Sequence, residues 1–584
     1  MKKKFYITTA IDYVNARPHV GHAFEKVLAD AIARKHKQQG EKVFFLTGVD
    51  ENAQKNVQAA EEKGIPVKEF IDQNTSLFLK LVKKLNIDND AFIRTTAKKH
   101  SKVVKEIVQK IIKKGDIYKG EYEGYYCVGC EGFVTEKDLI NGKCPEHNKK
   151  PEYRREDAYF FKLSKYQNQL IKFVKTYILP EEKKNEILFR LKKGLNDLCI
   201  SRKGAEWGIG FPGDKNFKIY VWIDALINYI SGSPENWPAN LHIIGKGINW
   251  FHSVIWPALL MSAGYKLPKK LLVHGYLISG GKKMSKSLGN VLDPLELLSK
   301  YSTDAVRYSL LRASVFDDSD YSEEVLIERY NNELANKLGN LISRVAGLIE
   351  KIGTEKTPNN LIKKLKEKEI EKKFKNYELD KALSLIFEFI DNCNEYVQNK
   401  KPWETKDKKV LYELKESILK IAELLWPFIP ESSEKITKQF NSKKIIKEEI
   451  LFKKIELEEK VNKEKDIEEI MANVGAVSFS DWEKLDLRVA EIKEIEDIPE
   501  ADKLYKLKID VGNLGKRIIC AGIKKYYSKE ELKNKKIIII SNLEPRTLRG
   551  IESHGMLLAA GDKEKDFCVL LTPDKKIENG MRIS

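Results

Sequence analysis

The first fifty residues combine two apolar runs with a helical pattern between them. The runs FYITTA (5–10) and KVFFLTGVD (42–50) each predict a short buried strand. Between these runs, residues 18–40 place Val20, Phe24, Val27, Leu28 and Ile32 near helical spacing. Strand, helix and strand in this order form a βαβ unit, which indicates a parallel sheet.

The same alternation returns after residue 215. Strands are expected at 218–225 (KIYVWIDA), 240–247 and 270–278, and a helix is expected over 248–263. We therefore predict one doubly wound α/β domain with a parallel sheet, built from residues 1–115 and 216–275 and interrupted by an insertion at 116–215. Ligands of such sheets bind at the carboxyl ends of the strands, so candidate chemistry is expected there.

Two further regions follow in the chain. Long helical patterns without strand-like runs begin near residue 322, and they predict an α-helical bundle over 331–455. Residues 456–474 are highly charged and form either a helix or a linker. Residues 475–584 contain six strand-like runs, which fit a small β-barrel such as an OB-fold: LRVAEIKEI, KLYKLKIDVG, RIICAGI, KKIIIISNL, GMLLAAG and FCVLL.

Composition narrows the class of protein. The 584 residues carry 104 Lys and Arg against 86 Asp and Glu, a net charge of +18. This excess suits a polyanionic partner such as nucleic acid, although a lysine-rich genome would also produce it. No run of 18 apolar residues is present, so no membrane span is expected, and the N-terminus does not resemble a signal peptide. Seven cysteines, three of them clustered, indicate a reduced cytoplasmic protein with a possible metal site.

Two polar segments follow predicted strands and carry candidate chemistry. His19, Gly21 and His22 stand at the start of the first predicted helix, where free N–H groups and the helix dipole favour an anion. The segment GGKKMSKSLGN (280–290) follows the last strand and concentrates lysines and serines. Its lysines could stabilise charge on a leaving pyrophosphate at the same sheet edge. The alternatives are a capping histidine pair and a solvated basic loop.

Together the two segments resemble the paired signatures of class I aminoacyl-tRNA synthetases, as His19-Val20-Gly21-His22 and Lys283-Met284-Ser285-Lys286-Ser287. Over essentially its whole length the chain is similar to the methionyl-tRNA synthetase family, which also has counterparts of Thr47–Glu51, Tyr220–Ala225, Phe251–Ala258 and Pro402-Trp403. The resemblance implies a split Rossmann-type sheet, a loop and tRNA-stem region at 276–330, and ligation of methionine to tRNA(Met) through methionyl-adenylate. It also implies that ATP, with Mg²⁺, is bound by His19, Gly21, His22, Lys283, Ser285 and Lys286, of which His19, His22, Lys283 and Lys286 are catalytic.

The resemblance further implies a methionine pocket with an apolar, aromatic wall. Its residues would be Ala10, Ile11, Tyr13, Asp50, Trp222, Ala225, Tyr229, Ile248 and His252. Sulfur–aromatic contacts suit a thioether, and Asp50 could hold the α-ammonium group. On the residues alone, a core position is favoured for Trp222, and Asp50 could cap a helix. Two positions depart from the family: Asn52-Ala53 replaces His-Gly, and Gly247 replaces an aspartate expected to contact the nucleotide or the amino acid.

The cysteine cluster lies in the predicted insertion. Cys127 and Cys130 form one pair of possible ligands, and Cys144 and His147 form a second pair after thirteen intervening residues. This spacing fits a tetrahedral structural Zn²⁺ site, a zinc knuckle, with four protein ligands and no open position. Unmetallated thiols are the alternative.

Contacts with tRNA are expected in both C-terminal regions. Asn340, Arg344 and Trp403 match family positions that read the anticodon, although ordinary helix packing would also explain them. The C-terminal barrel resembles an appended tRNA-binding domain, in which Lys506, Lys508, Arg546 and Arg549 are candidate contacts. In the family this domain also dimerises, so a homodimer is expected.

Two other functions compete with this prediction. A related class I enzyme for leucine, isoleucine or valine would need a large editing insertion, for which this chain has no room. A non-catalytic RNA-binding relative would not need His19, His22, Lys283 and Lys286, all of which are intact. A cytoplasmic methionine–tRNA ligase is therefore the preferred interpretation.

Overall fold

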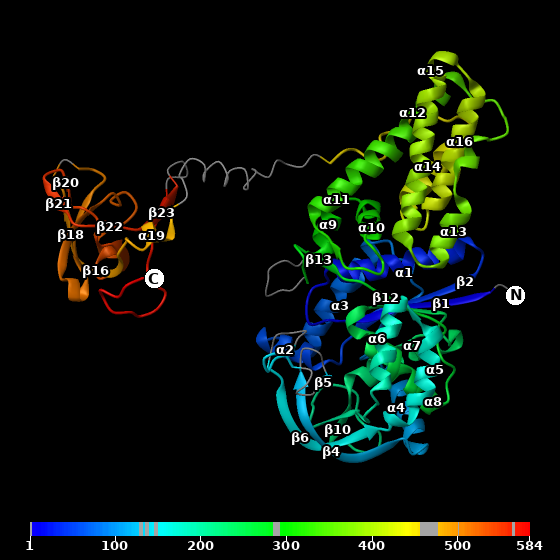
Figure 1. The fold of residues 1–584 in the computed structure, drawn as a ribbon, viewed down its shortest axis with the longest axis horizontal. Coiled ribbons are helices and arrows are strands. Elements are labelled where there is room, and N and C mark those ends of the chain that lie inside the picture. The colour runs from blue at the N-terminus through cyan, green and yellow to red at the C-terminus, as the bar shows by residue number, and fades with distance from the viewer. Residues whose placement is uncertain are drawn as a thin grey trace. The chain divides into compact units, whose positions relative to one another are not determined.

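The computed structural model describes residues 3–127, 132–134, 139–144, 150–283, 292–455, 477–499, 501–562 and 567–583. Two compact units make up the chain, Met1–Glu456 and Leu457–Ser584 (Figure 1). The first unit holds both predicted halves of the sheet, the insertion and the helical region. The second unit holds the predicted C-terminal strands.

A six-stranded parallel sheet in the order β3-β2-β1-β11-β12-β7 forms the centre of the first unit. Its strands are β1 (Lys4–Tyr13), β2 (Lys42–Asp50), β3 (Ala91–Arg94), β7 (Ile178–Leu179), β11 (Leu241–Gly245) and β12 (Leu271–His274). Ile7 of β1 lies opposite Phe45 of β2 on one side and Leu241 of β11 on the other. The prediction that two distant halves share one sheet is therefore confirmed. The insertion adds β7 at the edge, a strand too short for periodicity to reveal.

Helices cover both faces of this sheet. Neighbouring residues along a strand point to opposite faces, so each strand contributes side chains to two separate cores. Phe5 and Ile7 belong to a core shared with α1 (Val20–Gln38) and α10 (Thr303–Leu311). Tyr6 belongs to the opposite core. That second core also contains residues of α4 (Lys98–Lys113), α7 (Val221–Ser231) and α8 (Trp256–Ala263). Two more helices, α2 (Gln54–Glu62) and α3 (Val67–Lys84), follow β2.

Two predicted strands were wrong in part. Residues 218–225 do not join the parallel sheet: β10 (Phe217–Ile219) pairs with β9 (Ser201–Lys203), and α7 starts at Val221. Every residue of α7 is buried, and an apolar segment buried on all sides has no periodicity that separates helix from strand. The predicted strand 270–278 divides at Gly275 into β12 and β13 (Leu277–Ser279). A side chain at Gly275 would overlap the backbone of Asp317.

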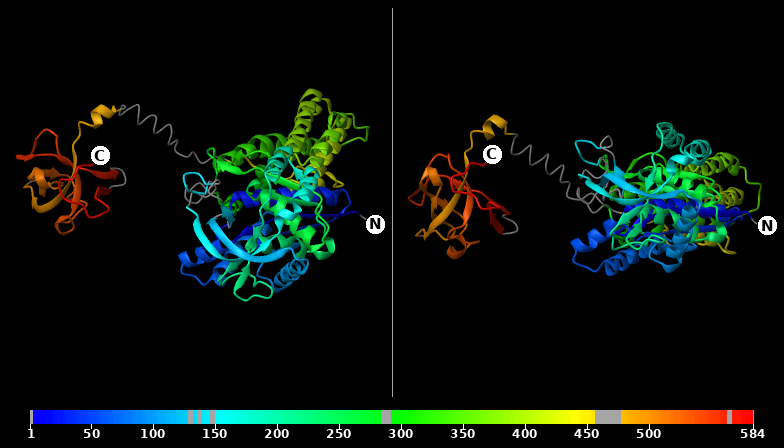
Figure 2. Two further views of the ribbon diagram at one scale, coloured as in Figure 1. Left: turned by 60° about the horizontal axis from the view of Figure 1, so that its bottom comes forward. Right: turned by 90° about the horizontal axis from the view of Figure 1, so that it is seen from below.

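The insertion has a sheet of its own, in the order β5-β4-β6-β8. Its strands are β4 (Ile117–Cys127), β5 (Gly132–Val134), β6 (Glu152–Phe161) and β8 (Leu198–Cys199), and its helices are α5 (Gln167–Tyr177) and α6 (Glu181–Lys192). The long strands β4 and β6 lie side by side in both views of Figure 2. A separate three-stranded sheet joins β13 to β14 (Lys282–Lys283) and β15 (Ser319–Asp320).

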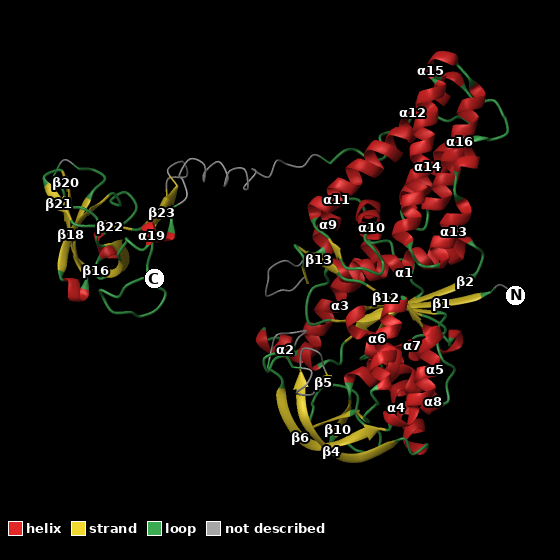
Figure 3. Ribbon diagram, in the orientation of Figure 1, coloured by secondary structure: helices red, strands yellow, loops and turns green. Residues whose placement is uncertain are grey.

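The helical prediction for the region after residue 322 is confirmed, since the described residues from there to 455 contain no strand (Figure 3). The described α-helices between residues 294 and 455 are α9 (Pro294–Lys300), α10, α11 (Glu323–Arg329), α12 (Asn340–Ile352), α13 (Glu367–Lys375), α14 (Leu379–Lys400), α15 (Pro402–Thr405), α16 (Lys408–Leu425) and α17 (Pro430–Phe440). A π-helix (Tyr330–Gly339) continues α11 into α12. The apolar side chains of these helices continue the core that begins on one face of the sheet. No helix among the described residues has the length and apolar character needed to cross a membrane.

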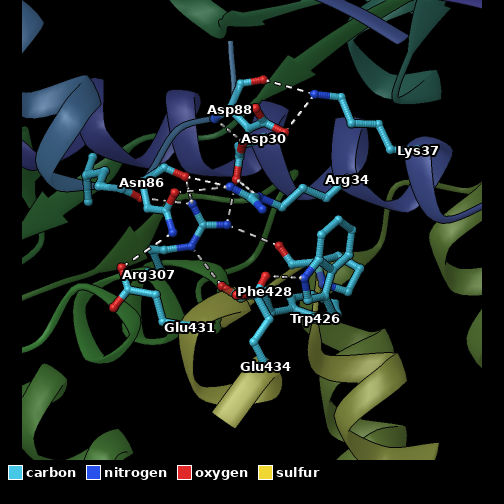
Figure 4. A network of polar contacts seen from close by, with 12 residues as sticks. Asp30, Arg34, Lys37, Asn86, Asp88, Arg307, Trp426, Phe428, Glu431 and Glu434 are labelled. Atoms are coloured by element: carbon cyan, nitrogen blue, oxygen red, sulfur yellow. Dashed lines mark hydrogen bonds and ion pairs between the residues drawn. The ribbon is translucent and has the colours of Figure 1, made fainter. Parts of the chain in front are cut away.

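A buried arginine joins the bundle to the sheet domain (Figure 4). The guanidinium of Arg307 on α10 is fully buried and lies 2.7 Å from Asp30 Oδ2 on α1. Its N–H groups also donate to the carbonyls of Phe428 (2.9 Å) and Pro427 (3.1 Å), in the turn between α16 and α17. A further bond reaches the Leu85 carbonyl at the end of α3 (3.0 Å). One side chain therefore connects three separate segments.

The second unit contains a five-stranded antiparallel sheet in the order β18-β17-β16-β19-β22. These strands are β16 (Leu487–Asp497), β17 (Tyr505–Asp510), β18 (Lys516–Ala521), β19 (Lys536–Ile540) and β22 (Met556–Leu557). Two hairpins, β20 (Arg546–Leu548) with β21 (Ile551–Ser553) and β23 (Ala559–Asp562) with β24 (Phe567–Leu570), and two short helices, α19 (Phe479–Trp482) and α20 (Lys529–Leu532), complete it. All six predicted runs contain strands. The predicted linker 456–474 lies outside the described residues.

Candidate active site

A cavity of about 260 Å³ lies at the carboxyl ends of β1, β2 and β11, where the sheet topology predicts ligands. Its lining includes Ala10, Ile11, Tyr13, His19, Gly21, His22, Asp50, Trp222, Ala225, Tyr229, Ile248 and His252. These are all nine predicted methionine residues together with the three predicted ATP residues of the first helix. Segments far apart in the sequence therefore meet at one cavity.

The start of α1 presents two imidazoles to this cavity. His19 caps the helix, and its Nδ1 accepts a hydrogen bond from the Gly21 N–H (3.0 Å). The Nδ1 of His22 accepts from the His19 N–H (3.1 Å), and the two rings stack with centroids 3.7 Å apart. A nitrogen that accepts carries no proton, so each ring carries its proton on Nε2. Burial lowers the pKa of His22 to about 3, which keeps this ring neutral.

Gly21 is required by the packing of His19. A Cβ added at Gly21 would lie 2.8 Å from Cε1 and 2.9 Å from Nδ1 of the His19 ring. Any larger residue would push the imidazole out of its capping position. Two Nε2–H donors therefore stand at the N-terminus of a helix, where the helix dipole favours negative charge, an arrangement suited to phosphate oxygens.

Aromatic rings form one wall of the cavity. The indole of Trp222 stacks on Phe251 with centroids 3.8 Å apart, and the ring of Tyr13 meets Trp222 edge-on at 6.3 Å. The Nδ1 of His252 lies 3.1 Å from the Ile248 carbonyl, which can only accept, so this nitrogen carries the proton. The hydroxyl of Tyr229 therefore donates to His252 Nε2 (2.7 Å). Burial lowers the pKa of His252 to about 4, so the ring is neutral.

Asp50 places a buried carboxylate at the end of β2. Its Oδ1 accepts from the Asn52 N–H (3.1 Å), and its carbonyl accepts from Asn56 Nδ2 (3.0 Å). The bond from Asn52 holds this carboxylate in place, where it could form a charge-assisted hydrogen bond with an ammonium group bound in the cavity. Ala53, one of the departures from the family pattern, is fully buried before the first turn of α2.

The second departure, Gly247, has a local explanation. A side chain at this position would overlap the hydroxyl of Tyr276, which also lines the cavity. Tyr276 is held by Asp318, which accepts from its backbone N–H (2.9 Å) and pairs with Lys246 (2.6 Å). The phenol therefore occupies the space that an aspartate at 247 would need.

Sequence reasoning missed a buried ionic cluster at the cavity wall. Asp12 and Glu25 line the cavity, and the Lys26 ammonium lies 2.6 Å from Asp12 Oδ2 and 3.6 Å from Glu25 Oε1. His274 Nε2 lies 3.1 Å from Glu25. Burial raises the pKa of Asp12, which Lys26 opposes; burial lowers the pKa of Lys26, but the two carboxylates outweigh it and leave that pKa raised. The available signal was the presence of charged residues, Asp12 in the first strand and the adjacent Glu25 and Lys26 in the first helix, within largely apolar segments.

Several predicted residues are described only in part. Lys283 lies in β14, where its backbone pairs with Ile278, but its side chain is outside the described part of the structure. Ser285 and Lys286 lie outside the described residues altogether.

The same limit applies to the predicted metal site. Cys127 ends β4 and Cys144 is also buried, whereas Cys130 and His147 lie outside the described residues. The described part of the chain accordingly contains no group of three or more potential metal ligands.

The predicted anticodon residues meet at one end of the bundle. The guanidinium of Arg344 on α12 lies 4.6 Å from the Trp403 ring centroid and donates to Gln398 (2.6 Å). Asn340 is exposed one turn earlier on the same helix. An exposed amide, an arginine and a half-buried indole therefore share one surface.

The four predicted contacts in the second unit fall into two groups. Lys508 pairs with Glu494 (2.5 Å) and Lys506 pairs with Glu496 (2.8 Å), while Arg546 and Arg549 are exposed on the β20–β21 hairpin and its turn. A basic groove beside these strands is lined by Lys493, Lys508, Lys516, Arg517 and His554, among others. Four of these five residues were not predicted.

Comparison with known proteins gives consistent matches along the chain. A family model described as "tRNA synthetases class I (M)" matches residues 5–150 and 134–346. A model described as "Anticodon-binding domain of tRNA ligase" matches residues 360–499, and one described as "Putative tRNA binding domain" matches residues 487–582.

Individual relatives match over their full length. A methionine–tRNA ligase of Caldanaerobacter subterraneus subsp. tengcongensis is 43% identical over 642 residues, and one of Thermotoga maritima is 42% identical over 634 residues; each alignment covers 100% of both chains. A solved structure, Mycobacterium tuberculosis methionyl-tRNA synthetase in complex with methionyl-adenylate, is 36% identical with a TM-score of 0.72. That match covers 75% of this chain and 94% of the other.

Proposed function

Because the chain belongs to the methionyl-tRNA synthetase family and is a methionine–tRNA ligase of class I, we propose that the cavity described above is where methionine is activated by ATP. The observation that carries this proposal is the convergence, at one sheet edge, of an aromatic wall, the Asp50 carboxylate and two Nε2–H donors. Each feature matches a different part of methionyl-adenylate.

The amino acid would enter with its thioether against the aromatic wall. Trp222, Tyr13 and His252 offer ring faces and edges to sulfur, which is a favourable contact. The α-ammonium would pair with Asp50, which leaves the carboxylate of methionine toward the start of α1. With methionine bound in this orientation, its carboxylate and the α-phosphate of ATP would be aligned before they react, which lowers the entropic part of the barrier.

In that step a carboxylate oxygen of methionine attacks the α-phosphorus of ATP, and the α–β bond breaks to release pyrophosphate. The Nε2–H groups of His19 and His22 would donate to phosphate oxygens as negative charge shifts. Lys283 and Lys286, which follow β13 in the sequence, would neutralise the leaving pyrophosphate, and Mg²⁺ would accompany ATP. A ribose hydroxyl of the terminal adenosine of tRNA(Met) then attacks the activated carbonyl, and AMP leaves.

Methionine-dependent pyrophosphate exchange tests the site assignment. Asp50→Asn should raise KM for methionine by roughly 10²-fold, since one charge-assisted bond is lost, and should leave KM for ATP within about twofold. A matched change, Asp90→Asn near the opposite end of β2, should leave both constants unchanged; this carboxylate accepts from the Phe45 N–H (2.8 Å). Equal effects of the two variants on methionine would argue against the assignment of the cavity.

For the insertion we propose one structural Zn²⁺ bound by Cys127, Cys130, Cys144 and His147. Burial of the two described thiols supports it, because thiolates of a structural site are shielded from water. When bound, the metal would link the segment 127–130 to the segment 144–147, both between the end of β4 and the start of β6. Elemental analysis of protein purified without chelator should give one zinc per chain, and zinc-free protein would remove the proposal.

For the second unit we propose a tRNA-binding OB-fold that also forms a homodimer in the cytoplasm. The basic groove supports contact with phosphates. Exposed apolar side chains on β22 and around β24 support self-association, since soluble monomers rarely expose such patches: Met556, Phe567, Val569 and Leu571. For the anticodon we propose Asn340, Arg344 and Trp403, whose shared surface suits stacking and edge recognition of unpaired bases.

A further inference from the structure

Asn52 connects two walls of the cavity that come from different halves of the sheet. Its backbone N–H donates to Asp50 Oδ1 at the end of β2 (3.1 Å). Its side-chain Nδ2 donates to Asp224 Oδ2 on α7 (2.8 Å) and to the Thr95 carbonyl (3.2 Å). One residue therefore bonds to the carboxylate proposed for the α-ammonium and to the helix that carries the aromatic wall.

The bond to Asp224 belongs to a buried chain of polar groups. Asp224 Oδ1 lies 2.6 Å from His100 Nε2 on α4, and His100 Nδ1 lies 2.7 Å from Ser231 Oγ, back on α7. All three side chains are at most 2% exposed. A buried network of this kind is rigid only when each member keeps its partner. Asn52 is the member that connects the chain to β2.

The amide suits this position for a specific reason. An amide NH₂ has two hydrogens on one nitrogen and can serve Asp224 and the Thr95 carbonyl together. The imidazole that the family usually has at this position carries one hydrogen on a ring nitrogen, so that nitrogen could donate to only one of these two acceptors. Trp222, two residues before Asp224 on α7, and Ala225, the residue after it, both line the cavity. Movement of Asp224 would therefore move the wall itself.

We propose that Asn52 is a positioning residue for methionine, which fixes the separation between the Asp50 carboxylate and the Trp222 wall. This inference rests on the assignment of the cavity to methionine. It predicts that Asn52 affects methionine binding and leaves ATP binding unchanged, because the start of α1 is not part of the network.

Two variants test the proposal in the full-length protein. Asn52→Ala should raise KM and the dissociation constant for methionine by about tenfold, the factor expected when a hydrogen bond to a charged group is lost, with KM for ATP within about twofold. Equilibrium dialysis with labelled methionine measures binding without catalysis. Asn52→Asp is nearly isosteric and places a second carboxyl against Asp224.

The aspartate variant should acquire a pH dependence that the parent lacks. The titratable groups bonded to position 52 or to its partner are Asp50, Asp224 and His100, and the neighbouring carboxylates favour the protonated form of the new group. When protonated, the new carboxyl can still donate to Asp224. When ionised, it repels Asp224, so KM for methionine should rise by on the order of tenfold between pH 6 and 8.5 relative to the parent.

A matched control separates this effect from general damage. Asn240 Oδ1 accepts from the Tyr6 N–H (3.0 Å) at the opposite end of the sheet, and Asn240→Asp retains an acceptor there. This variant should show the parental pH profile. If Asn52→Ala fails to fold, the pH profile of Asn52→Asp still tests the role of Asn52, because the protonated carboxyl at this position can still donate to Asp224.

The outcomes distinguish this inference from the assignment on which it rests. Parental methionine constants in Asn52→Ala, or a parental pH profile in Asn52→Asp, would overturn the role of Asn52. If Asp50→Asn is also silent, the cavity does not bind methionine and both proposals fail. If Asp50→Asn weakens methionine binding while the Asn52 variants do not, only the role of Asn52 is lost.

Discussion

Replacement of Arg307 by methionine should destabilise the first unit more than any surface change of the same type. Arg307→Met keeps a long, flexible side chain but removes the charge and every donor. Asp30 would keep its bonds to Arg34 (2.7 Å) and to the Asp88 N–H (2.8 Å) (Figure 4). The carbonyls of Leu85, Pro427 and Phe428 would lose the guanidinium donors.

The expected size of the effect follows from burial. Removing one member of a fully buried ion pair costs about 3–5 kcal/mol, and each buried acceptor left without a donor costs about 1–3 kcal/mol. Methionine recovers part of this through apolar contacts, so we expect a net loss of about 3–5 kcal/mol. If the free energy of unfolding falls by about 3 kcal/mol for each molar increase in urea, this loss lowers the urea concentration at the unfolding midpoint by roughly 1–2 M. Arg307→Lys should fall between parent and Arg307→Met, because it keeps the charge with fewer donors.

Tryptophan fluorescence in a urea titration provides the assay. The sequence has 8 tryptophans, and all but Trp482 lie in the first unit, so the signal reports mainly on that unit. Lys337→Met is the matched control, since it removes an exposed lysine whose ammonium is 2.8 Å from Asp391. Exposed pairs contribute about 0–1 kcal/mol. A midpoint for Arg307→Met no lower than that of Lys337→Met would refute the idea that the buried guanidinium holds the bundle to the sheet domain.

Four other changes have definite expected outcomes. Gly21→Ala should displace the His19 ring and slow pyrophosphate exchange by about 10²-fold at an unchanged methionine dissociation constant; a parental rate would contradict this. Burial lowers the pKa of His252 to about 4, so below pH 6.5 the folded state binds fewer protons than the unfolded state. The free energy of unfolding should therefore fall by on the order of 3 kcal/mol from pH 6.5 to 4. If the urea midpoint of His252→Gln changes with pH as it does in the parent, this contribution of His252 is disproved. Trp403→Ala should raise KM for tRNA about tenfold or more without affecting exchange, and normal aminoacylation would assign the indole to packing. Val569→Asp should halve the mass measured by light scattering if β24 carries the dimer contact, whereas a mass equal to that of the parent would exclude that face.

Motifs and the family resemblance predicted a large part of the cavity lining, because several of its residues stand at strand ends. His19, Asp50 and Ile248 follow or end strands, and parallel topology brings such positions to one edge regardless of their separation in sequence. The strand pattern failed for 218–225 because burial on every side removes the polar positions on which periodicity depends. That segment nevertheless contributes Trp222 and Ala225 to the cavity, so the functional assignment did not depend on the type of secondary structure.

Partnerships across the fold could not be predicted in the same way. Nothing near Arg307 in the sequence indicates that its guanidinium faces backbone carbonyls from a turn more than 100 residues later. The same holds for His274, whose carboxylate partner Glu25 lies on α1, and for Lys26 of α1, whose partner Asp12 lies on β1. Such groups are identified only when tertiary packing shows which charges are excluded from water.

The two departures from the family pattern show how tertiary context changes the meaning of a substitution. Along the sequence, Gly247 stands where the family has a carboxylate and Asn52 where it has an imidazole, and each change predicts the loss of a contact. In the fold, the Tyr276 hydroxyl fills the space beside Gly247, and the Asn52 amide bonds to two partners at once. In both cases a polar group remains at the place where one was lost. The departures therefore alter the chemistry at Gly247, which lines the cavity, and at Asn52, which bonds to the lining residue Asp50, and they leave the fold that forms the cavity unchanged.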